Sequence, residues 1–266
     1  MELNYSWSPE YAELLHKYPS ARPSLATLLD YIPNIKPRLY SIASSSRFHS
    51  NEECHLCIIK NEWTATSGRS RVGLATNWLA DAFPEGGQET KVHACIHPSA
   101  VVLPGTHTTP MFMVALGTGI APMRAFIEER AAAQRAGEEC APMALFFGAR
   151  NRQEYSYEEE FDAYQKEGVL EHIHLALSRE QKEKIYVTHR LKQQQHLIYD
   201  LIHEKHGNFY LCGLGGNVPP QVRQAVVDAI RANGRTEEYA EKYVLDMQIG
   251  GRYNVEAWWG RRTILQ

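Results

Sequence analysis

The run Met111-Phe112-Met113-Val114-Ala115-Leu116 leads directly into the turn Gly117-Thr118-Gly119 and then into Ile120-Ala121-Pro122. Six apolar residues without polar alternation predict a strand that helices cover on both faces, as in a parallel sheet. The two glycines allow a tight turn, and Pro122 falls near the first turn of a helix, where a missing N–H costs nothing. The free N–H groups at such a helix start favour a phosphate, although an ordinary strand-to-helix turn can also contain Gly-Thr-Gly.

The chain after Thr109 alternates between strand-like and helix-like runs. With right-handed crossovers, this rhythm predicts an α/β fold with a doubly wound parallel sheet. A helix over 237–247 and a last strand over 253–259, rich in aromatic residues, are expected to follow. The runs before them are 111–116, 122–134, 143–147, 157–166, 172–177, 190–205, 208–212 and 219–233.

The chain before Thr109 has a different character. Residues 14–35 are helix-like but interrupted by Pro19, Pro23 and Pro33, so they predict the end of a helical region. Short β-rich runs follow at 38–43, 55–59 and 91–96, separated by turn residues, and they predict a barrel or small sheet. These strands are too few to close a barrel, so we expect an incomplete one and a chain that is part of a longer protein.

The composition excludes several classes of protein. A net charge of −3 with dispersed basic residues gives no case for a nucleic-acid partner. No apolar run approaches the roughly 20 residues that cross a bilayer, so no membrane segment is expected. The five cysteines are an odd and scattered set, which favours a reducing, cytoplasmic setting. Cys54 and Cys57 have a C-x-x-C spacing but no second pair, so no metal site is expected.

Two upstream motifs have the chemistry of a flavin site. Arg38-Leu39-Tyr40-Ser41 offers a cation for a pyrophosphate, an aromatic plane for a flavin ring and a hydroxyl group near it. The second motif is Gly73-Leu74-Ala75-Thr76. Together with the glycine turn at 117–119, which suits a nicotinamide dinucleotide, they predict a hydride-transfer enzyme.

Polar residues follow the strand 172–177 at the edge where doubly wound sheets bind ligands. Ser178 and Arg179 come first, and Lys184 and Tyr186 stand a few residues later. A guanidinium and an ammonium can hold a 2′-phosphate while an aromatic ring covers adenine, which favours NADPH over NADH. A solvated charged loop is the alternative.

Three residues near the ends of the last strands complete the candidate site. Cys212 ends a parallel strand at the same edge, where its thiol can face a nicotinamide or simply pack as a buried cysteine. Glu256 offers a carboxylate for proton movement. Trp258 offers an indole that covers a flavin face, or that packs in the core.

With these residues assembled, the chain resembles the reductase half of the diflavin enzymes of the ferredoxin–NADP reductase superfamily. The resemblance implies a partial antiparallel FAD-binding β-barrel followed by a doubly wound parallel-sheet NADP-binding domain. It divides the chain into the end of a helical connecting region (1–36), the barrel (37–106) and the NADP(H)-binding domain (107–266). The matching stretches are 38–45, 73–79, 117–122, 178–181, 212–213 and 252–253.

The resemblance also implies a role for individual residues. Arg38 and Thr76 would meet the FAD pyrophosphate, Tyr40 and Ser41 the isoalloxazine, and Trp63 the adenine. Cys57 and Ile59 would line the same cleft. Ser41, Cys212 and Glu256 would form the hydride-transfer cluster, with Trp258 shielding the flavin. The departures from the family are Glu256 for a usual aspartate, Thr188 for glutamine, Leu214 for aspartate and Met123 for phenylalanine, and Trp259 has no family role.

The implied reaction is hydride transfer from NADPH to FAD. Electrons would then pass singly through an FMN domain, which this chain lacks, to a haem protein such as a cytochrome P450. One alternative is part of a sulfite reductase flavoprotein or another diflavin reductase. A second is a noncatalytic NADP-binding module without FAD, because the expected barrel is incomplete.

Overall fold

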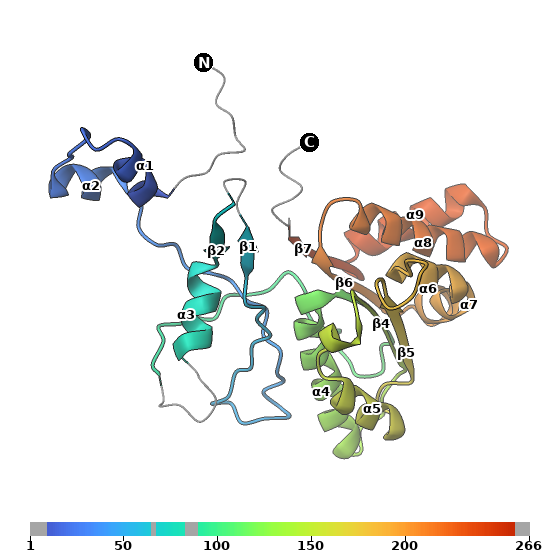
Figure 1. Cartoon of the computed structure of the whole chain (residues 1–266). Coiled ribbons are helices and arrows are strands. Elements are labelled where there is room, and N and C mark those ends of the chain that lie inside the picture. Colours follow the sequence, from blue (N-terminus) through green and yellow to red (C-terminus); the bar gives the residue numbers. More distant parts are fainter. Residues whose placement is uncertain (1–9, 65–67, 83–89, 259–266) are drawn as a thin grey trace. The chain divides into compact units, whose positions relative to one another are not determined.

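A computed structural model describes residues 10–64, 68–82 and 90–258 (Figure 1). The chain divides into two compact units. Unit 1 comprises Met1–Leu39 and Ile58–Ala94, and unit 2 comprises Tyr40–Cys57 and Cys95–Gln266. Among the described residues, no helix combines the length and the apolar character needed to span a lipid bilayer.

Unit 2 is built on a five-stranded, fully parallel sheet. The strand order β5-β4-β3-β6-β7 places β3 at the centre, with the chain moving outward first to one side and then to the other. This order confirms the doubly wound sheet and puts its switch point between β3 and β6. The strands are β3 (Met111–Leu116), β4 (Met143–Ala149), β5 (His172–Leu177), β6 (Asn208–Leu214) and β7 (Tyr253–Trp258).

Helices cover both faces of this sheet (Figure 1). Met111 and Met113 of β3 pack in the core on the side of α4, whereas Phe112 and Val114 pack in the core on the side of α8. Burial on both faces explains why this strand is apolar without alternation. One face carries α4 (Ile120–Arg135) and α5 (Glu158–Lys166), and the other carries α6 (Val187–Gln193), α7 (Gln195–Ile198), α8 (Val218–Ala232) and α9 (Glu237–Ile249).

The expected single helix over 190–205 is wrong. Gln194 leaves the helical backbone conformation (φ −114°, ψ 32°) between α6 and α7, and the π-helix η3 (Tyr199–Glu204) continues the chain. Leu191, Ile198 and Ile202 all lie in the same hydrophobic core. Spacings of seven and four residues also bring these side chains to one face of a continuous α-helix, so the apolar pattern of the sequence does not reveal the break. Short 3₁₀ turns complete the unit at η1 (Gly117–Gly119) and η2 (Arg152–Glu154).

Unit 1 begins with two short helices, as the proline-interrupted pattern predicts. They are α1 (Tyr11–Lys17) and α2 (Leu25–Tyr31). An antiparallel pair of strands, β1 (Glu62–Thr64) and β2 (Ser70–Val72), follows, and then α3 (Leu74–Ala82). The helix α3 is not among the elements predicted from the sequence.

The three β-rich runs expected at 38–43, 55–59 and 91–96 are not strands. The first two share only an isolated antiparallel bridge, Ile42 with Leu56, beside the bond from Ala43 N to His55 O at 2.8 Å. A strand needs a neighbouring strand to accept and donate its backbone hydrogen bonds. These runs have strand-like residues but no such neighbour among the described residues, so they stay extended or irregular.

Candidate functional site

The turn between β3 and α4 has the geometry of an anion site. Gly117 has a positive φ of 54°, which favours glycine. A Cβ on Gly119 would lie 2.1 Å from the carbonyl oxygen of Cys212, so only glycine lets the start of α4 approach β6 this closely. The turn, including Thr118, delivers the N-terminus of a 16-residue helix to the switch point of the sheet. The free N–H groups and partial positive charge there fit a dinucleotide pyrophosphate.

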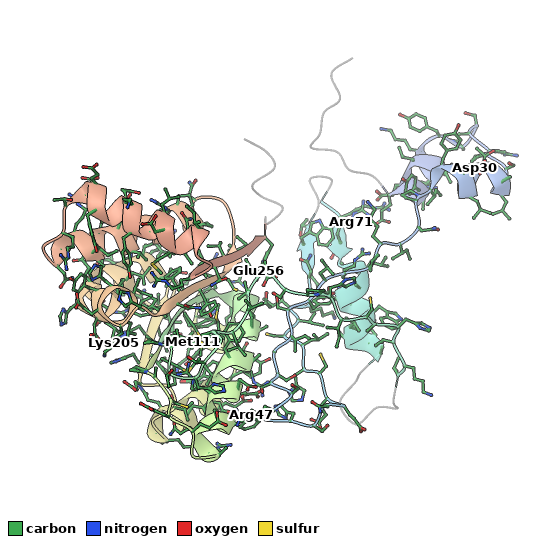
Figure 2. All side chains as sticks on the ribbon, turned by 180° about the vertical axis from the view of Figure 1, so that it is seen from behind. Asp30, Arg47, Arg71, Met111, Lys205 and Glu256 are labelled. Atoms are coloured by element: carbon green, nitrogen blue, oxygen red, sulfur yellow. The ribbon has the colours of Figure 1, made fainter. Side chains whose placement is uncertain are left out.

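Three of the predicted residues come together beside this turn. Ser41 Oγ donates a hydrogen bond to Glu256 Oε2 at 3.3 Å, although 215 positions separate the two residues. Glu256 lies on β7 directly opposite Cys212 on β6 (Figure 2 labels Glu256). Cys212 in turn pairs with Ala115 of the central strand. A hydroxyl, a carboxylate and a thiol thus meet at the switch-point side of the sheet.

Burial keeps the Cys212 thiol protonated. The side chain is fully buried, and burial, reinforced by the negative charge of Glu256, raises the pKa of Cys212 to about 12. A protonated thiol is neither a nucleophile nor a metal ligand near neutral pH. Cys212 can therefore pack against the site and offer a weak S–H donor. Its burial agrees with a thiol that faces the nicotinamide and equally with a cysteine that only packs in the core.

Trp258 closes β7 next to this cluster. It pairs with Leu214 of β6, and its carbonyl oxygen accepts a bond from Gly215 N at 2.8 Å. Its side chain is half-buried, as is that of Tyr40, which belongs to the same unit. Trp259, the residue without a family role, lies outside the described residues.

The loop after β5 presents the residues predicted to hold a 2′-phosphate. Both the backbone N–H and the hydroxyl of Ser178 bond to Ala149 O, and Arg179 N bonds to Arg150 O at 2.7 Å, so the loop is tied to the end of β4. The side chains of Arg179, Lys184 and Tyr186 are exposed. Within the described part of the chain, Arg179 forms no ion pair, and its guanidinium is available to an anion.

In unit 1, a second glycine turn opens α3. Gly73 N bonds to Asn61 O at 2.6 Å, and Thr76 Oγ1 accepts a bond from Asn61 N at 3.1 Å. A Cβ on Gly73 would lie 2.6 Å from Thr76 Oγ1, so a larger residue there would displace the hydroxyl that accepts from Asn61 N. The motif that continues through Leu74 and Ala75 is therefore a helix N-terminus, which suits a phosphate.

The other predicted flavin residues are divided between the two units. Unit 1 contains Arg38, whose guanidinium bonds to Lys36 O, the exposed Ile59, and Trp63, which pairs with Arg71 across β1 and β2. Unit 2 contains Tyr40, Ser41 and Cys57. Cys57 is half-buried against the core on the α4 side, whereas Cys54 is exposed.

Sequence reasoning missed Arg124, a buried arginine on α4. Its Nη1 donates to Ala43 O at 2.7 Å, two residues after Ser41. Its other nitrogens pair with Glu128 at 2.8 Å and with Glu160 at 2.7 Å. Arg124 thus ties the segment that carries Ser41 to α4. The only hint in the sequence is the i,i+4 spacing of Arg124 and Glu128, which does not distinguish a buried pair from a surface pair.

Comparison with known families agrees with this arrangement. Residues 2–78 match the family described as "FAD binding domain" and residues 113–217 match "Oxidoreductase NAD-binding domain". These matches support FAD and NADP(H) as the cofactors. They fall on the parts of the chain that carry the two glycine turns.

Individual relatives cover almost the whole chain. It is 38% identical over 265 residues to NADPH–cytochrome P450 reductase of Mus musculus, which is 97% of this chain and 39% of that protein. The reductase of Drosophila melanogaster is 36% identical over 247 residues. The NADP(+)-dependent mitochondrial pyruvate dehydrogenase of Euglena gracilis is 38% identical over 250 residues, 93% of this chain and 14% of that protein. The chain thus spans about two-fifths of the length of the P450 reductases it matches.

Proposed function

The chain belongs to the diflavin reductase family as a part with an FAD-binding and an NADP(H)-binding domain, and from this membership we propose that it transfers hydride from NADPH to FAD. FAD accepts a hydride and can release electrons one at a time. The protein supplies binding, orientation and electrostatics. The observation that carries the proposal is the hydrogen bond of Ser41 with Glu256, formed beside Cys212 and the glycine turn.

Each member of the cluster has a separate task. The Ser41 hydroxyl holds its proton toward Glu256, which orients both side chains. The Glu256 carboxylate places negative charge where the nicotinamide becomes positive on giving up hydride, and such charge complementarity stabilises a transition state. The protonated Cys212 packs against the site without taking a proton. Trp258, at the end of β7, would cover the flavin face and would have to give way to the nicotinamide.

The two nucleotides are bound by the two glycine turns. The N-terminus of α4, with Gly117, Thr118 and Gly119, holds the NADPH pyrophosphate, while Ser178, Arg179, Lys184 and Tyr186 select the 2′-phosphate. Arg38 and the start of α3 hold the FAD pyrophosphate. The remaining flavin contacts are Tyr40, Cys57, Ile59 and Trp63.

We propose domain boundaries at 36 and 106, and the partners, from the resemblance to the family. We place the end of a helical connecting region at 1–36, the FAD-binding part at 37–106 and the NADP(H)-binding domain at 107–266. The reduced flavin passes electrons through an FMN domain, of the same or another chain, to a haem protein. The reaction takes place in the cytoplasm or at the cytoplasmic face of a membrane.

A second candidate keeps the enzyme and changes the acceptor. The sequence identity to the Euglena pyruvate dehydrogenase is as high as the identity to the P450 reductases. Similar reductase parts therefore occur in proteins with different overall activities. A sulfite reductase flavoprotein or another diflavin enzyme fits in the same way. A noncatalytic NADP-binding module is the remaining alternative, and it predicts a protein that binds NADP without FAD.

The test compares single-turnover hydride transfer in three variants. Glu256→Gln keeps the shape but removes the charge, and Ser41→Ala removes the hydroxyl, so both should slow FAD reduction by at least about tenfold, the scale of one lost electrostatic contact. Glu238→Gln removes one exposed carboxylate at the start of α9 and should reduce FAD at the wild-type rate. If the first two variants also reduce FAD at that rate, the cluster does not take part in the transfer.

A further inference from the structure

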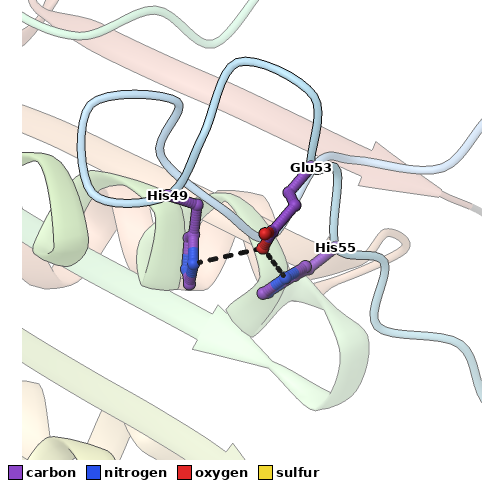
Figure 3. A group of neighbouring side chains, drawn as sticks. All are labelled: His49, Glu53 and His55. Carbon is purple, nitrogen blue, oxygen red and sulfur yellow. Dashed lines mark ion pairs between the residues drawn. The ribbon is translucent and has the colours of Figure 1, made fainter.

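A second group of functional side chains lies in the loop of unit 2 that follows Ser45. His49 Nδ1 is 3.7 Å and His55 Nε2 is 3.6 Å from the same Oε2 of Glu53, and the three side chains converge on one point (Figure 3). One ligand atom from each residue lies within 4.8 Å of the others. We propose that His49, Glu53 and His55 bind a divalent transition-metal ion of the zinc, cobalt and nickel class. This site lies outside the residues assigned to hydride transfer.

The strongest support comes from the second nitrogen of His49. His49 Nε2 lies 3.0 Å from Oε1 of Glu128, whose side chain is fully buried. Glu128 is itself held by Arg124 at 2.8 Å and by Ser45 N at 2.8 Å. A carboxylate only accepts, so the His49 proton sits on Nε2 and the lone pair of the neutral ring sits on Nδ1. Metal-binding histidines are characteristically oriented by such a carboxylate on the other nitrogen.

Hydrogen bonds also fix the backbone at both histidines before any ion binds. His49 N bonds to Ser45 O at 3.0 Å, and His55 N bonds to Ser44 Oγ at 2.9 Å. The ring centroids of His49 and His55 are only 4.3 Å apart. Because these residues are already ordered, binding of the ion costs little conformational entropy, and this favours binding.

Binding of the ion requires a change of tautomer at His55, which lowers the affinity. Its Nδ1 lies 3.3 Å from Arg124 Nη1, and a guanidinium only donates, so the neutral ring carries its proton on Nε2 in the metal-free protein. A metal on Nε2 requires the other tautomer, whose Nδ1 proton would face the Arg124 donor. The ring must therefore turn away from Arg124 and give up this long hydrogen bond. Arg124 keeps its bonds to Ala43 O, Glu128 and Glu160. The cost lowers the affinity without unpairing the buried cation.

The donor set identifies the class of ion. Two imidazole nitrogens and one carboxylate suit zinc, cobalt and nickel, whereas calcium and magnesium prefer oxygen ligands only. Zinc bonds to such ligands are about 2.0–2.2 Å long, so tetrahedral ligands lie about 3.4 Å apart, close to the 3.6 and 3.7 Å found here. The Glu53 side chain is 56% exposed, which leaves room for water as a further ligand. From the sequence, only Cys54 and Cys57 were candidate metal ligands, so this site was not predicted.

The test is calorimetric titration of the FAD-loaded chain with zinc chloride. We expect one ion per chain in the wild type, and a dissociation constant at least about tenfold higher in Glu53→Gln, because even second-shell losses cost 10–100-fold. The matched control Glu52→Gln removes a neighbouring exposed carboxylate and should bind as the wild type does. Cys54→Ser should also bind normally, which separates this site from a thiolate site.

Three further measurements make the outcome decisive. His49→Gln should weaken zinc binding as strongly as Glu53→Gln. Titration of the wild type with magnesium chloride should give no heat of binding, and magnesium should not displace zinc. FAD reduction by NADPH should proceed at the wild-type rate in Glu53→Gln, so failure of the metal site is distinguishable from failure of the proposed function. No zinc binding in the wild type, or binding that survives in Glu53→Gln or is lost in Cys54→Ser, would overturn the proposal.

Discussion

Gly119 shows how a missing side chain fixes the nucleotide site. Its Cβ would lie 2.1 Å from Cys212 O and 2.9 Å from Gly213 N, both backbone atoms of β6 that cannot turn aside. Gly119→Ala should therefore push α4 away from the sheet and destabilise the protein by about 1–3 kcal/mol, the usual range for overpacking. NADPH should bind more weakly as well. Urea unfolding and NADPH titration measure the two effects.

Gly105 provides the matched control, because a Cβ there meets nothing within 4 Å. The free energy of unfolding of Gly105→Ala should lie within about 0.5 kcal/mol of the wild-type value. Equal stability of the Gly119 and Gly105 variants would show that α4 does not depend on this close approach.

Arg179 is the residue-scale test of cofactor choice. Its exposed guanidinium has no ion-pair partner among the described residues, and each charge-assisted bond to a phosphate is worth about 1.5–3 kcal/mol. Arg179→Ala should raise KM for NADPH by about tenfold to a hundredfold and leave KM for NADH unchanged. Lys166→Ala, which removes an exposed cation at the end of α5, is the control. An equal loss for both cofactors would refute the 2′-phosphate assignment.

At the scale of elements, α4 depends on its buried arginine. Arg124 is 6% exposed and Glu128 is fully buried, so Arg124→Ala leaves a buried carboxylate without its cation. Breaking a buried pair in this way costs about 3–5 kcal/mol. Denaturant unfolding should show a loss of that size. Arg135→Ala, which breaks the exposed pair with Glu167, should cost at most about 1 kcal/mol, and similar losses in both variants would contradict the account.

In unit 1, α1 is joined to β2 by charge. The pKa of Glu13 is lowered to about 2 from an ordinary 4.5, chiefly by its hydrogen bond with Arg71 and further by its own helix start and Arg69. A lowered pKa in the folded state means that this contact stabilises the fold above pH 4.5 and is lost as the pH falls through about 2. An NMR titration of the Glu13 carboxyl should give a midpoint near pH 2. A midpoint near 4.5 would mean that α1 and β2 are not joined in solution.

The elements also show what a sequence can and cannot reveal. The bounds of β3 and β5 are predictable to the residue, because burial on both faces makes β3 continuously apolar and turn residues end both strands. The runs at 38–43 and 55–59 also contain residues typical of strands, yet they share only a single bridge. Whether such a run forms a strand depends on a neighbouring strand to pair with, and not on the run alone. The break at Gln194 could not be predicted either, because the buried Leu191, Ile198 and Ile202 keep the spacing of a continuous helix.

For the whole molecule, the sequence motifs predict the residues of the candidate site better than they predict the buried residues that hold those residues in position. Cys212 and Glu256 meet because β6 and β7 are neighbouring parallel strands, and Ser41, which lies on no strand, reaches Glu256 by a hydrogen bond. Arg124 and the pair of Glu128 with His49 escaped prediction, because a buried charge looks like a surface charge in the sequence. The residues that hold the Ser41 segment in place are therefore known only from the structure.

The central claim is hydride transfer from NADPH to FAD, and one anaerobic experiment tests it most directly. The purified chain, supplied with FAD and freed of excess, is mixed with NADPH while the visible absorbance of the flavin is recorded. The account predicts a yellow protein whose flavin absorbance bleaches on mixing, and much more slowly with NADH. Bound flavin that stays oxidised, or a colourless protein that still binds NADP, would contradict it.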